Sequence, residues 1–379
     1  MKIVVLGAGL VGLPMALDLA NEKNFEVTIV DINPKSLDKA KTYKELKILQ
    51  SDLSSAENVK EIIKPYDLVI SAVPGFMGFQ TLKTIIEAKK NVVDIAFFPE
   101  NPFELNKLAQ ENNITAIVDC GVAPGMSHIL TGYVNHLLDE LTKVRIYVGG
   151  LPVVRTWPYE YKAVFSPIDV LEEYTRPSRL VENGKMVVKP ALSENELLDF
   201  PGVGTLEAFN SDGLRTLVET IDAPDMAEKT LRYPGHIQIM EVLRHSGFFN
   251  KNEIEINGSK ISPLDVTAEL LKQEWKLGQG EKDLTVMQVI LEGIKGKEKF
   301  RYQYDLLDYF DEETEIHSMA RTTGYTATVV ARLLLEGKIS RQGIIVPEFL
   351  GEEPEVVTSI LQGLRDRKID YRESIEKIS

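Results

Sequence analysis

The amino-terminal region contains glycines whose spacing is typical of a phosphate-binding turn. Gly7, Gly9 and Gly12 form GxGxxG between an apolar run that predicts a strand and a run that predicts a helix, and Leu10 and Val11 complete the turn. The first glycine permits a tight turn, the second lets backbone approach a pyrophosphate, and the third lets helix pack on strand. Because a helix N-terminus offers N–H groups and a partial positive charge, this pattern predicts a dinucleotide site.

Two further positions belong to the same expected site. Asp31 ends the next expected strand, where a carboxylate can accept hydrogen bonds from both hydroxyls of an adenine ribose. It would repel a 2′-phosphate, so NAD is predicted rather than NADP, although the nearby Lys35 keeps NADP as the alternative. Val73 and Pro74 follow a later strand, and we expect their loop to border the pyrophosphate. The structural alternatives are a glycine turn that only packs helix on strand and an ordinary Pro-Gly turn.

A turn in the middle of the chain has residues suited to holding a carboxylate. Arg215 and Thr216 follow Ser211 and Asp212, either of which could cap a helix that begins there. Arg215 at such a helix start would clamp a substrate carboxylate. The alternative is a surface arginine that pairs with Glu219.

A second loop concentrates polar side chains before an amphipathic helix. Arg232, Tyr233 and His236 flank a Pro-Gly pair, and we expect this loop to contact substrate, with turn and capping roles as the alternative. Arg232 is a second candidate carboxylate clamp. His236 and Tyr233 are the candidates for a catalytic base or proton relay.

The remaining cysteine and histidines predict no further chemistry. Cys120 and His128 both follow the last expected amino-terminal strand. Hydride transfer needs no covalent intermediate, and a buried cysteine at a strand end is usually a packing residue. The other histidines lack metal-ligand spacing, so we predict no metal site. They are His136, His245 and His317.

The elements that must position these residues begin with a Rossmann pattern. Short apolar runs alternate with helical segments, as in a doubly wound parallel sheet with helices on both faces. The expected strands are 2–6, 26–30, 47–50, 67–73, 91–95 and 115–119, and helices are expected to begin near residues 13, 35, 56, 78 and 102.

After this region the rhythm changes to a second α+β domain with a mainly antiparallel sheet. Strands are expected at 143–148, 284–294, 300–309 and 314–319, the last three being joined by short polar turns. The predicted domains are a dinucleotide-binding Rossmann domain at 1–122, a substrate and dimerisation domain at 123–320, and a helical segment at 321–379 that packs back on the first domain.

Composition limits the class of protein. A length of 379 residues favours more than one domain. The net charge of -14 argues against a general nucleic-acid binder, since phosphate contacts need clustered Lys and Arg. With one cysteine, no signal peptide and no spanning segment, the sequence predicts a cytoplasmic protein that binds a small molecule and no membrane.

Several blocks in order along the chain resemble the saccharopine dehydrogenase family, and within it most of all the L-lysine 6-dehydrogenases. One departure favours this subgroup: saccharopine-forming members are similar in a Gly-Leu-Asp-Pro-Gly turn, whereas Ala123 stands at the Asp position here. The blocks are the glycine turn, 119–126, 212–217, 230–236 and 323–327.

The resemblance implies NAD-dependent oxidation of L-lysine at its terminal amine to the 6-semialdehyde, which cyclises to piperideine carboxylate. It also implies a homodimer built through the sheet of the second domain. Saccharopine and carboxynorspermidine are the alternative substrates. Alternatives of another class are a non-catalytic NAD/NADH sensor and a lyase or epimerase with tightly held NAD.

Overall fold

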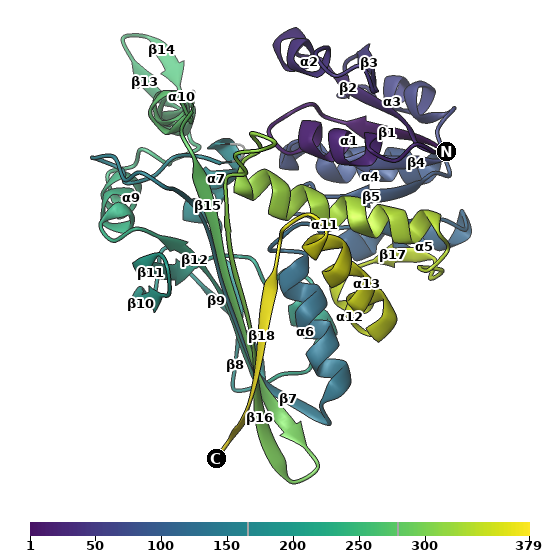
Figure 1. The fold of residues 1–379 in the computed structure, drawn as a ribbon. Coiled ribbons are helices and arrows are strands. Elements are labelled where there is room, and N and C mark those ends of the chain that lie inside the picture. Colours follow the sequence, from purple (N-terminus) through teal and green to yellow (C-terminus); the bar gives the residue numbers. More distant parts are fainter. Residues whose placement is uncertain (165–166, 279) are drawn as a thin grey trace. The chain divides into compact units, whose positions relative to one another are not determined.

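The computed structural model describes residues 1–164, 167–278 and 280–379, which form two compact units (Figure 1). The first unit contains Met1–Leu137 and Ala320–Asp370, and the second contains Leu138–Met319 and Tyr371–Ser379. The chain therefore passes from the first unit to the second, back again, and ends in the second.

The first unit contains a seven-stranded parallel sheet in the order β17-β6-β5-β4-β1-β2-β3. Its central strands are nearly continuous apolar runs, as expected where helices cover both faces. Strand order reverses between β1 and β4, where ligands bind in such sheets. The strands are β1 (Lys2–Leu6), β2 (Glu26–Asp31), β3 (Leu46–Gln50), β4 (Leu68–Ser71), β5 (Asn91–Asp94), β6 (Thr115–Ile117) and β17 (Gly343–Ile345).

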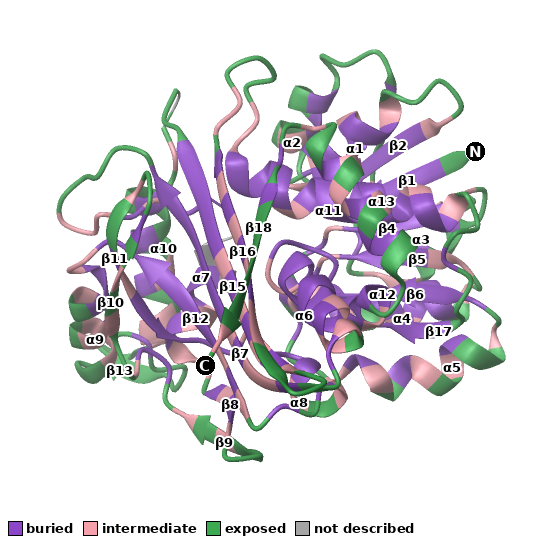
Figure 2. Ribbon diagram, turned by 60° about the horizontal axis from the view of Figure 1, so that its bottom comes forward, coloured by how far each residue is buried: buried purple, intermediate pink, exposed green. Residues whose placement is uncertain are grey.

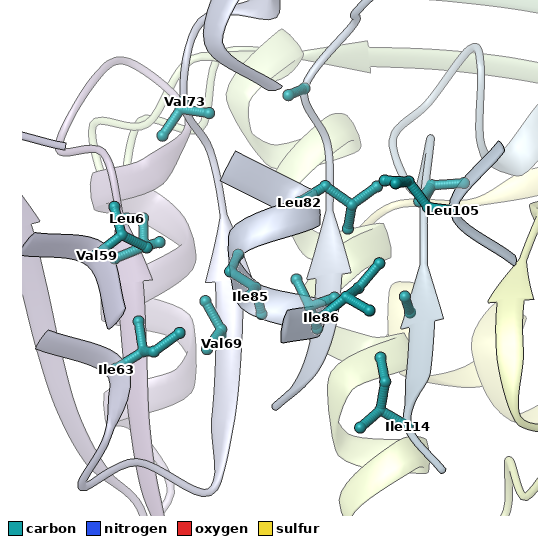
Figure 3. Close-up of a cluster of buried hydrophobic side chains, with 14 of the residues drawn as sticks. Leu6, Val59, Ile63, Val69, Val73, Leu82, Ile85, Ile86, Leu105 and Ile114 are labelled. Atoms are coloured by element: carbon teal, nitrogen blue, oxygen red, sulfur yellow. The ribbon is translucent and has the colours of Figure 1, made fainter. Parts of the chain in front are cut away.

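Helices bury an apolar stripe against this sheet. Figure 3 shows Val59 and Ile63 of one helix, and Ile85 and Ile86 of the next, beside Val69 of β4. Each such side chain stabilises the fold by about 1.5–3 kcal/mol when fully buried. The helical segments are α1 (Gly12–Ala20), α2 (Pro34–Ala40), α3 (Ala56–Ile63), α4 (Gly75–Glu87), η1 (Pro102–Leu105), α5 (Asn106–Glu111), α6 (Met126–Leu137), α11 (Ser318–Leu335), α12 (Pro347–Gly351) and α13 (Pro354–Arg365).

Close helix packing places α6 in the first unit, whereas the sequence alone puts the boundary after residue 122. A Cβ on Gly132 of α6 would lie 2.1 Å from the carbonyl oxygen of Glu348, and one on Gly351 of α12 would lie 2.3 Å from that of Ile129. Only glycine permits this approach, and the two helices lie side by side in Figure 1.

The second unit is built on a nine-stranded sheet in which β10-β11-β12-β7-β15-β16-β18 form the main path and β8 and β9 branch from β12. All its pairs are antiparallel except β12 with β7. A separate hairpin is formed by β13 and β14. The strands are β7 (Glu140–Pro152), β8 (Ser178–Glu182), β9 (Lys185–Lys189), β10 (Glu196–Phe200), β11 (Gly204–Asn210), β12 (Asp225–Arg232), β13 (Ile254–Ile256), β14 (Ser259–Ile261), β15 (Asp283–Lys295), β16 (Glu298–Tyr309) and β18 (Tyr371–Ile378).

Helices of the second unit surround an aromatic core. Tyr174, Phe209, Trp275 and Met240 are fully buried, and Leu271 is buried in the same cluster. The helices are α7 (Pro167–Thr175), α8 (Leu217–Thr220), α9 (His236–His245) and α10 (Pro263–Trp275).

The structure has the predicted fold class, but some of its elements differ from those predicted. The six expected strands of the first sheet are all present, but the three-residue β17 was missed. The expected strand at 314–319 is wrong: Ser318 and Met319 form the first turn of α11, whose N–H groups donate to the carboxylate of Asp283 at 2.7 and 3.0 Å. That buried acceptor stabilises a helix start instead.

The carboxyl-terminal segment needs a second correction, because it is not helical to its end. β18 pairs with β16 from Tyr371 to Ile378, and Figure 2 shows most of this strand exposed. An edge strand rich in charged residues has too little apolar alternation to be recognised from sequence.

Candidate functional site

The glycine turn of the first unit has the close contacts that its spacing predicts. Gly7 adopts φ +105°, and a Cβ there would lie 2.5 Å from the carbonyl oxygen of Ala72. A Cβ on Gly12 would lie 2.1 Å from the carbonyl oxygen of Gly7. Gly9 differs, because no atom of the described chain beyond its own neighbours lies within 4 Å of its Cβ position. Gly7 and Gly12 therefore permit close packing of the backbone, whereas the space next to Gly9 is open.

Helix α1 begins at this turn in a form that suits an anion. Val11 is its N-cap, and among the described residues no side chain caps it and no acid lies in its first turn. The first N–H groups of a helix lack intrahelical partners, so phosphate oxygens can accept from them. Leu10, within the turn, is 49% exposed.

The Asp31 carboxylate is held beside the turn. Oδ2 accepts from the backbone N–H of Ala8 at 2.7 Å, and Oδ1 accepts from that of Asn33 at 2.7 Å. Each carboxylate oxygen has a second lone pair, so both can still accept ribose hydroxyls. The next residue, Ile32, is 59% exposed and offers an apolar surface next to the carboxylate.

The loop after β4 lies against the glycine turn. The Cβ position of Gly7 lies 3.6 Å from the backbone nitrogen of Val73, and that of Gly12 lies 3.4 Å from Cβ of Ala72. Pro74 is the N-cap of α4, again without a side-chain cap bond among the described residues. The structure thus brings together all the cofactor residues predicted from the sequence, at the point where strand order reverses.

Cys120 has an environment that suits packing rather than nucleophilic chemistry. The side chain is fully buried, and burial together with the charges of Asp94 and Asp119 raises the pKa of its thiol far above the usual range. The thiolate, which is the nucleophile, is therefore strongly disfavoured.

In the second unit, the turn around Arg215 differs from the expected helix start. α8 is a single turn whose N-cap is Thr216, without a side-chain cap bond in the described structure. The predicted cap by Ser211 or Asp212 is therefore wrong: Asp212 pairs with Arg179 at 2.8 Å instead. Arg215 is buried and adopts φ +50°.

Arg232 lies inside the aromatic core of the second unit. Its Nη2 is 2.5 Å from Oε2 of Glu173, and its Nε donates to the hydroxyl of Tyr174 at 3.1 Å. Its guanidinium carbon is 4.4 Å from the centroid of the Tyr161 ring. The side chain is 2% exposed, so the cation is satisfied by an ion pair and by aromatic faces.

His236 shares the Tyr174 hydroxyl with Arg232. Nε2 lies 3.0 Å from this hydroxyl, and Nδ1 lies 2.7 Å from the carbonyl oxygen of Tyr159. Nδ1 therefore carries the proton, and Nε2 accepts from Tyr174. Burial and then the nearby Arg232 lower the pKa of His236 to about 3, so the imidazole is neutral at physiological pH.

Tyr233 points to a different group. Its hydroxyl donates to the carbonyl oxygen of Pro152 at 3.0 Å, and Arg155 lies over its ring at 4.8 Å. Burial raises the pKa of Tyr233. Of the predicted substrate residues, Arg232 and His236 are therefore brought together by Tyr174, while Tyr233 makes separate contacts.

Sequence reasoning missed Glu173 and Tyr174 of this cluster, and it also missed Glu228 beside the turn that precedes Arg215. Glu173 and Tyr174 lie on α7 in no recognisable motif, and only the fold brings them to Arg232. Glu228 is a fully buried acid on β12 whose pKa is raised to about 8 by burial. Four of the eight residues of β12 are charged, so the pattern of the strand does not single out Glu228.

Comparison with known proteins covers both units. Residues 121–369 match the family model of the saccharopine dehydrogenase C-terminal domain, and residues 3–117 match that of the saccharopine dehydrogenase NADP binding domain. The chain belongs to the saccharopine dehydrogenase family.

Relatives of this family member differ in length. It is 24% identical to bovine mitochondrial alpha-aminoadipic semialdehyde synthase over 98% of its own length but only 47% of the relative, so it spans about half of that protein. It is 22% identical to the carboxyaminopropylagmatine dehydrogenase of Synechocystis, with 93% of this chain and 94% of the relative covered. The apo saccharopine dehydrogenase (L-Glu forming) of Saccharomyces cerevisiae has the same fold, with a TM-score of 0.80, 19% identity and 100% coverage of both chains.

Within residues 1–164, 167–278 and 280–379, no helix is both long and apolar enough to span a bilayer. In the same part of the chain, His, Cys, Asp and Glu residues form no group of three or more that could hold a metal ion.

Proposed function

We propose that this family member is an NAD-dependent oxidoreductase that oxidises the terminal CH–NH₂ group of L-lysine. The observation that carries this proposal is the open glycine turn at an uncapped helix start, beside the fixed carboxylate of Asp31. Gly9, Leu10 and Val11 would hold the pyrophosphate, and Asp31 the adenine ribose. The bound nicotinamide would supply a hydride acceptor.

The preference for NAD over NADP rests on charge. Both oxygens of Asp31 are oriented by backbone N–H groups, so the carboxylate cannot easily turn away from a 2′-phosphate. The nearby cation is Lys35, whose backbone N–H donates to Oδ1 of Asn33 at 3.0 Å and whose side chain is exposed. Like charge at the ribose therefore favours NAD.

Residues of the second unit would bind and deprotonate the amino acid. Arg215, followed in the chain by Thr216, and Arg232 are the proposed partners of the substrate carboxylate. Arg232 would have to exchange part of its ion pair with Glu173 for that contact. An alkyl ammonium has a pKa near 10.4 and must lose a proton before its carbon can release a hydride. Of the two candidates for a base or relay, His236 has a pKa lowered to about 3 and cannot hold this proton, so its proposed role is that of a neutral hydrogen-bond partner of Tyr174. Tyr233 remains the candidate that would relay the proton to water.

The overall reaction would convert one C–N single bond into an imine while the nicotinamide is reduced. Water would then hydrolyse the imine to the 6-semialdehyde and ammonia, and the semialdehyde would cyclise in solution. Removal of the Arg232 cation should raise the KM for lysine far more than that for NAD. Equal changes of both constants in Arg232→Ala would refute the carboxylate clamp.

A substrate panel tests this function. Purified protein would be mixed with NAD and, separately, with L-lysine, saccharopine, carboxynorspermidine or carboxyaminopropylagmatine, and the absorbance of reduced nicotinamide would be followed. We expect reduction with lysine. Reduction with saccharopine alone would instead favour the activity named for the yeast relative. No reduction in a protein that still binds NAD would favour a sensor, or a lyase or epimerase that holds NAD.

We also propose a homodimer through the sheet of the second unit. A groove of about 500 Å³ on this sheet is lined by acidic and basic residues, among them the pairs Arg145–Asp225 and Lys229–Glu196. A two-fold interface presents a surface to itself and therefore suits a patch with both signs of charge. Light scattering should give twice the chain mass; a monomer at micromolar concentration would contradict the proposal.

A further inference from the structure

The turn that carries Arg215 lies directly on a buried carboxyl group. Oε2 of Glu228 accepts from the hydroxyl of Ser211 at 2.7 Å and from the backbone N–H of Gly213 at 3.1 Å. The Ser211 hydroxyl is also 2.7 Å from that of Thr230, on the same strand as Glu228. One oxygen of Glu228 thus joins two positions of the turn to β12.

Gly213 of the turn packs closely against the side chain of Glu228. A Cβ at position 213 would lie 2.3 Å from Cδ of Glu228, so only glycine allows this approach. On its other side the turn is tied to β8, because Asp212 accepts from the guanidinium of Arg179 at 2.8 and 3.0 Å. The turn is therefore attached to two strands, to β12 through Glu228 and to β8 through the pair of its own Asp212 with Arg179.

This double attachment explains the backbone of Arg215. A non-glycine residue at φ +50° occupies a region that is unfavourable for an L-residue with a long side chain. Such a conformation persists only where surrounding contacts determine it. The contacts at Ser211, Asp212 and Gly213, which immediately precede Arg215, are suited to that role.

The charges around Glu228 make its own ionisation unfavourable. Burial is the main cause that raises its pKa to about 8, and the acids that face it are Glu173 of α7 and Asp212 of the turn. At neutral pH the carboxyl group is therefore mostly protonated. Above pH 8 the new negative charge would be repelled by both acids, at a group in contact with the turn.

We infer that Glu228 is a positioning residue that fixes the turn of residues 210–216 so that Arg215 and Thr216 are correctly placed for the substrate carboxylate. The inference rests on the proposed function, in which Arg215 binds that carboxylate. It predicts that the affinity for the amino acid, but not for the dinucleotide, depends on the state of Glu228.

Two variants and a matched control test the inference. Glu228→Gln keeps the shape and the acceptor oxygen but cannot ionise, while Glu228→Ala removes the contact. Asp199→Asn is the control, because this acid lies on β10 and accepts from the Thr205 hydroxyl at the end of β11 far from the turn. The constants to measure are KM for the amino acid and KM for NAD, from pH 6.5 to 9.5.

In the wild type and in Asp199→Asn we expect KM for the amino acid to rise above pH 8, and in Glu228→Gln we expect it to stay level. Glu228→Ala should raise this KM about tenfold, as for the loss of one or two hydrogen bonds, with KM for NAD unchanged. If Glu228→Ala does not fold, the pH profile of Glu228→Gln still decides. The inference would be overturned, and the proposed function left standing, if KM for the amino acid still rose above pH 8 in Glu228→Gln, or if KM for the amino acid and KM for NAD changed equally. If the wild type turned over no amino acid, the proposed function and the inference would both be overturned.

Discussion

Nε2 of His236 lies 3.0 Å from the hydroxyl of Tyr174, which also accepts from the guanidinium of Arg232. This tyrosine connects a neutral imidazole to a buried cation. A histidine in that environment cannot bind a proton without placing a second positive charge beside Arg232. The cluster formed by Glu173, Tyr174, Arg232 and His236, called the substrate cluster below, therefore holds a single buried pair of opposite charges as long as His236 is neutral.

The first prediction concerns acid stability. The pKa of folded His236 is lowered to about 3, whereas the unfolded value is near 6.5. As the pH falls below 6.5 the unfolded chain takes up this proton and the folded chain does not, so the stability falls, by up to about 1.4 kcal/mol per pH unit. Denaturant unfolding at pH 6.5, 5.5 and 4.5 should show a steeper loss in the wild type than in His236→Gln. Equal slopes would show that His236 is protonated in the folded protein.

The second prediction separates the roles of two glycines. Gly12→Ala should lower stability, because its Cβ would lie 2.1 Å from backbone, whereas Gly9→Ala should leave the melting temperature within a few degrees of the wild type. Gly9→Ala should nevertheless weaken NAD binding by at least tenfold, since its Cβ would occupy the space expected for the pyrophosphate. Wild-type NAD affinity in Gly9→Ala would mean that the open space is not the phosphate site.

The third prediction concerns the attachment of the carboxyl-terminal helices to the first unit. Asp18 of α1 pairs with Arg332 of α11 at 2.8 Å and with Arg367, just after α13, at 2.7 Å. All three side chains are largely buried, so Asp18→Ala should lower the free energy of unfolding by about 3–5 kcal/mol by leaving buried charges without their partner.

The exposed pair Lys41–Asp38 is the control for that prediction, because both of its side chains are more than half exposed. Asp38→Ala should change stability by less than about 1 kcal/mol. Similar losses in the two variants would show that the Asp18 network contributes no more than a surface ion pair.

The sequence predicted the first unit better than the second for a physical reason. The glycine turn, Asp31 and the apolar strands are local signals, and neighbouring strands in a Rossmann sheet follow one another in sequence. β17 has three residues, and β18 is an exposed edge strand rich in charge, so neither has a strong pattern.

The substrate cluster depends instead on contacts between distant residues. Arg232 and His236 stood out as a loop motif, but their partners Glu173 and Tyr174 come from a helix far away in the sequence. The predicted helix cap by Asp212 was wrong because the Asp212 carboxylate pairs with Arg179, which is distant in the sequence. Burial, which neutralises His236 and Glu228, cannot be read from residue types alone.

The most direct test of the whole account is a calorimetric titration of the protein with NAD, NADH and NADP, for the wild type and for Asp31→Ala. We predict saturable binding of NAD and NADH, binding of NADP at least tenfold weaker, and loss of that discrimination in Asp31→Ala. Absence of saturable binding for all three nucleotides would contradict the assignment of the glycine turn as a dinucleotide site.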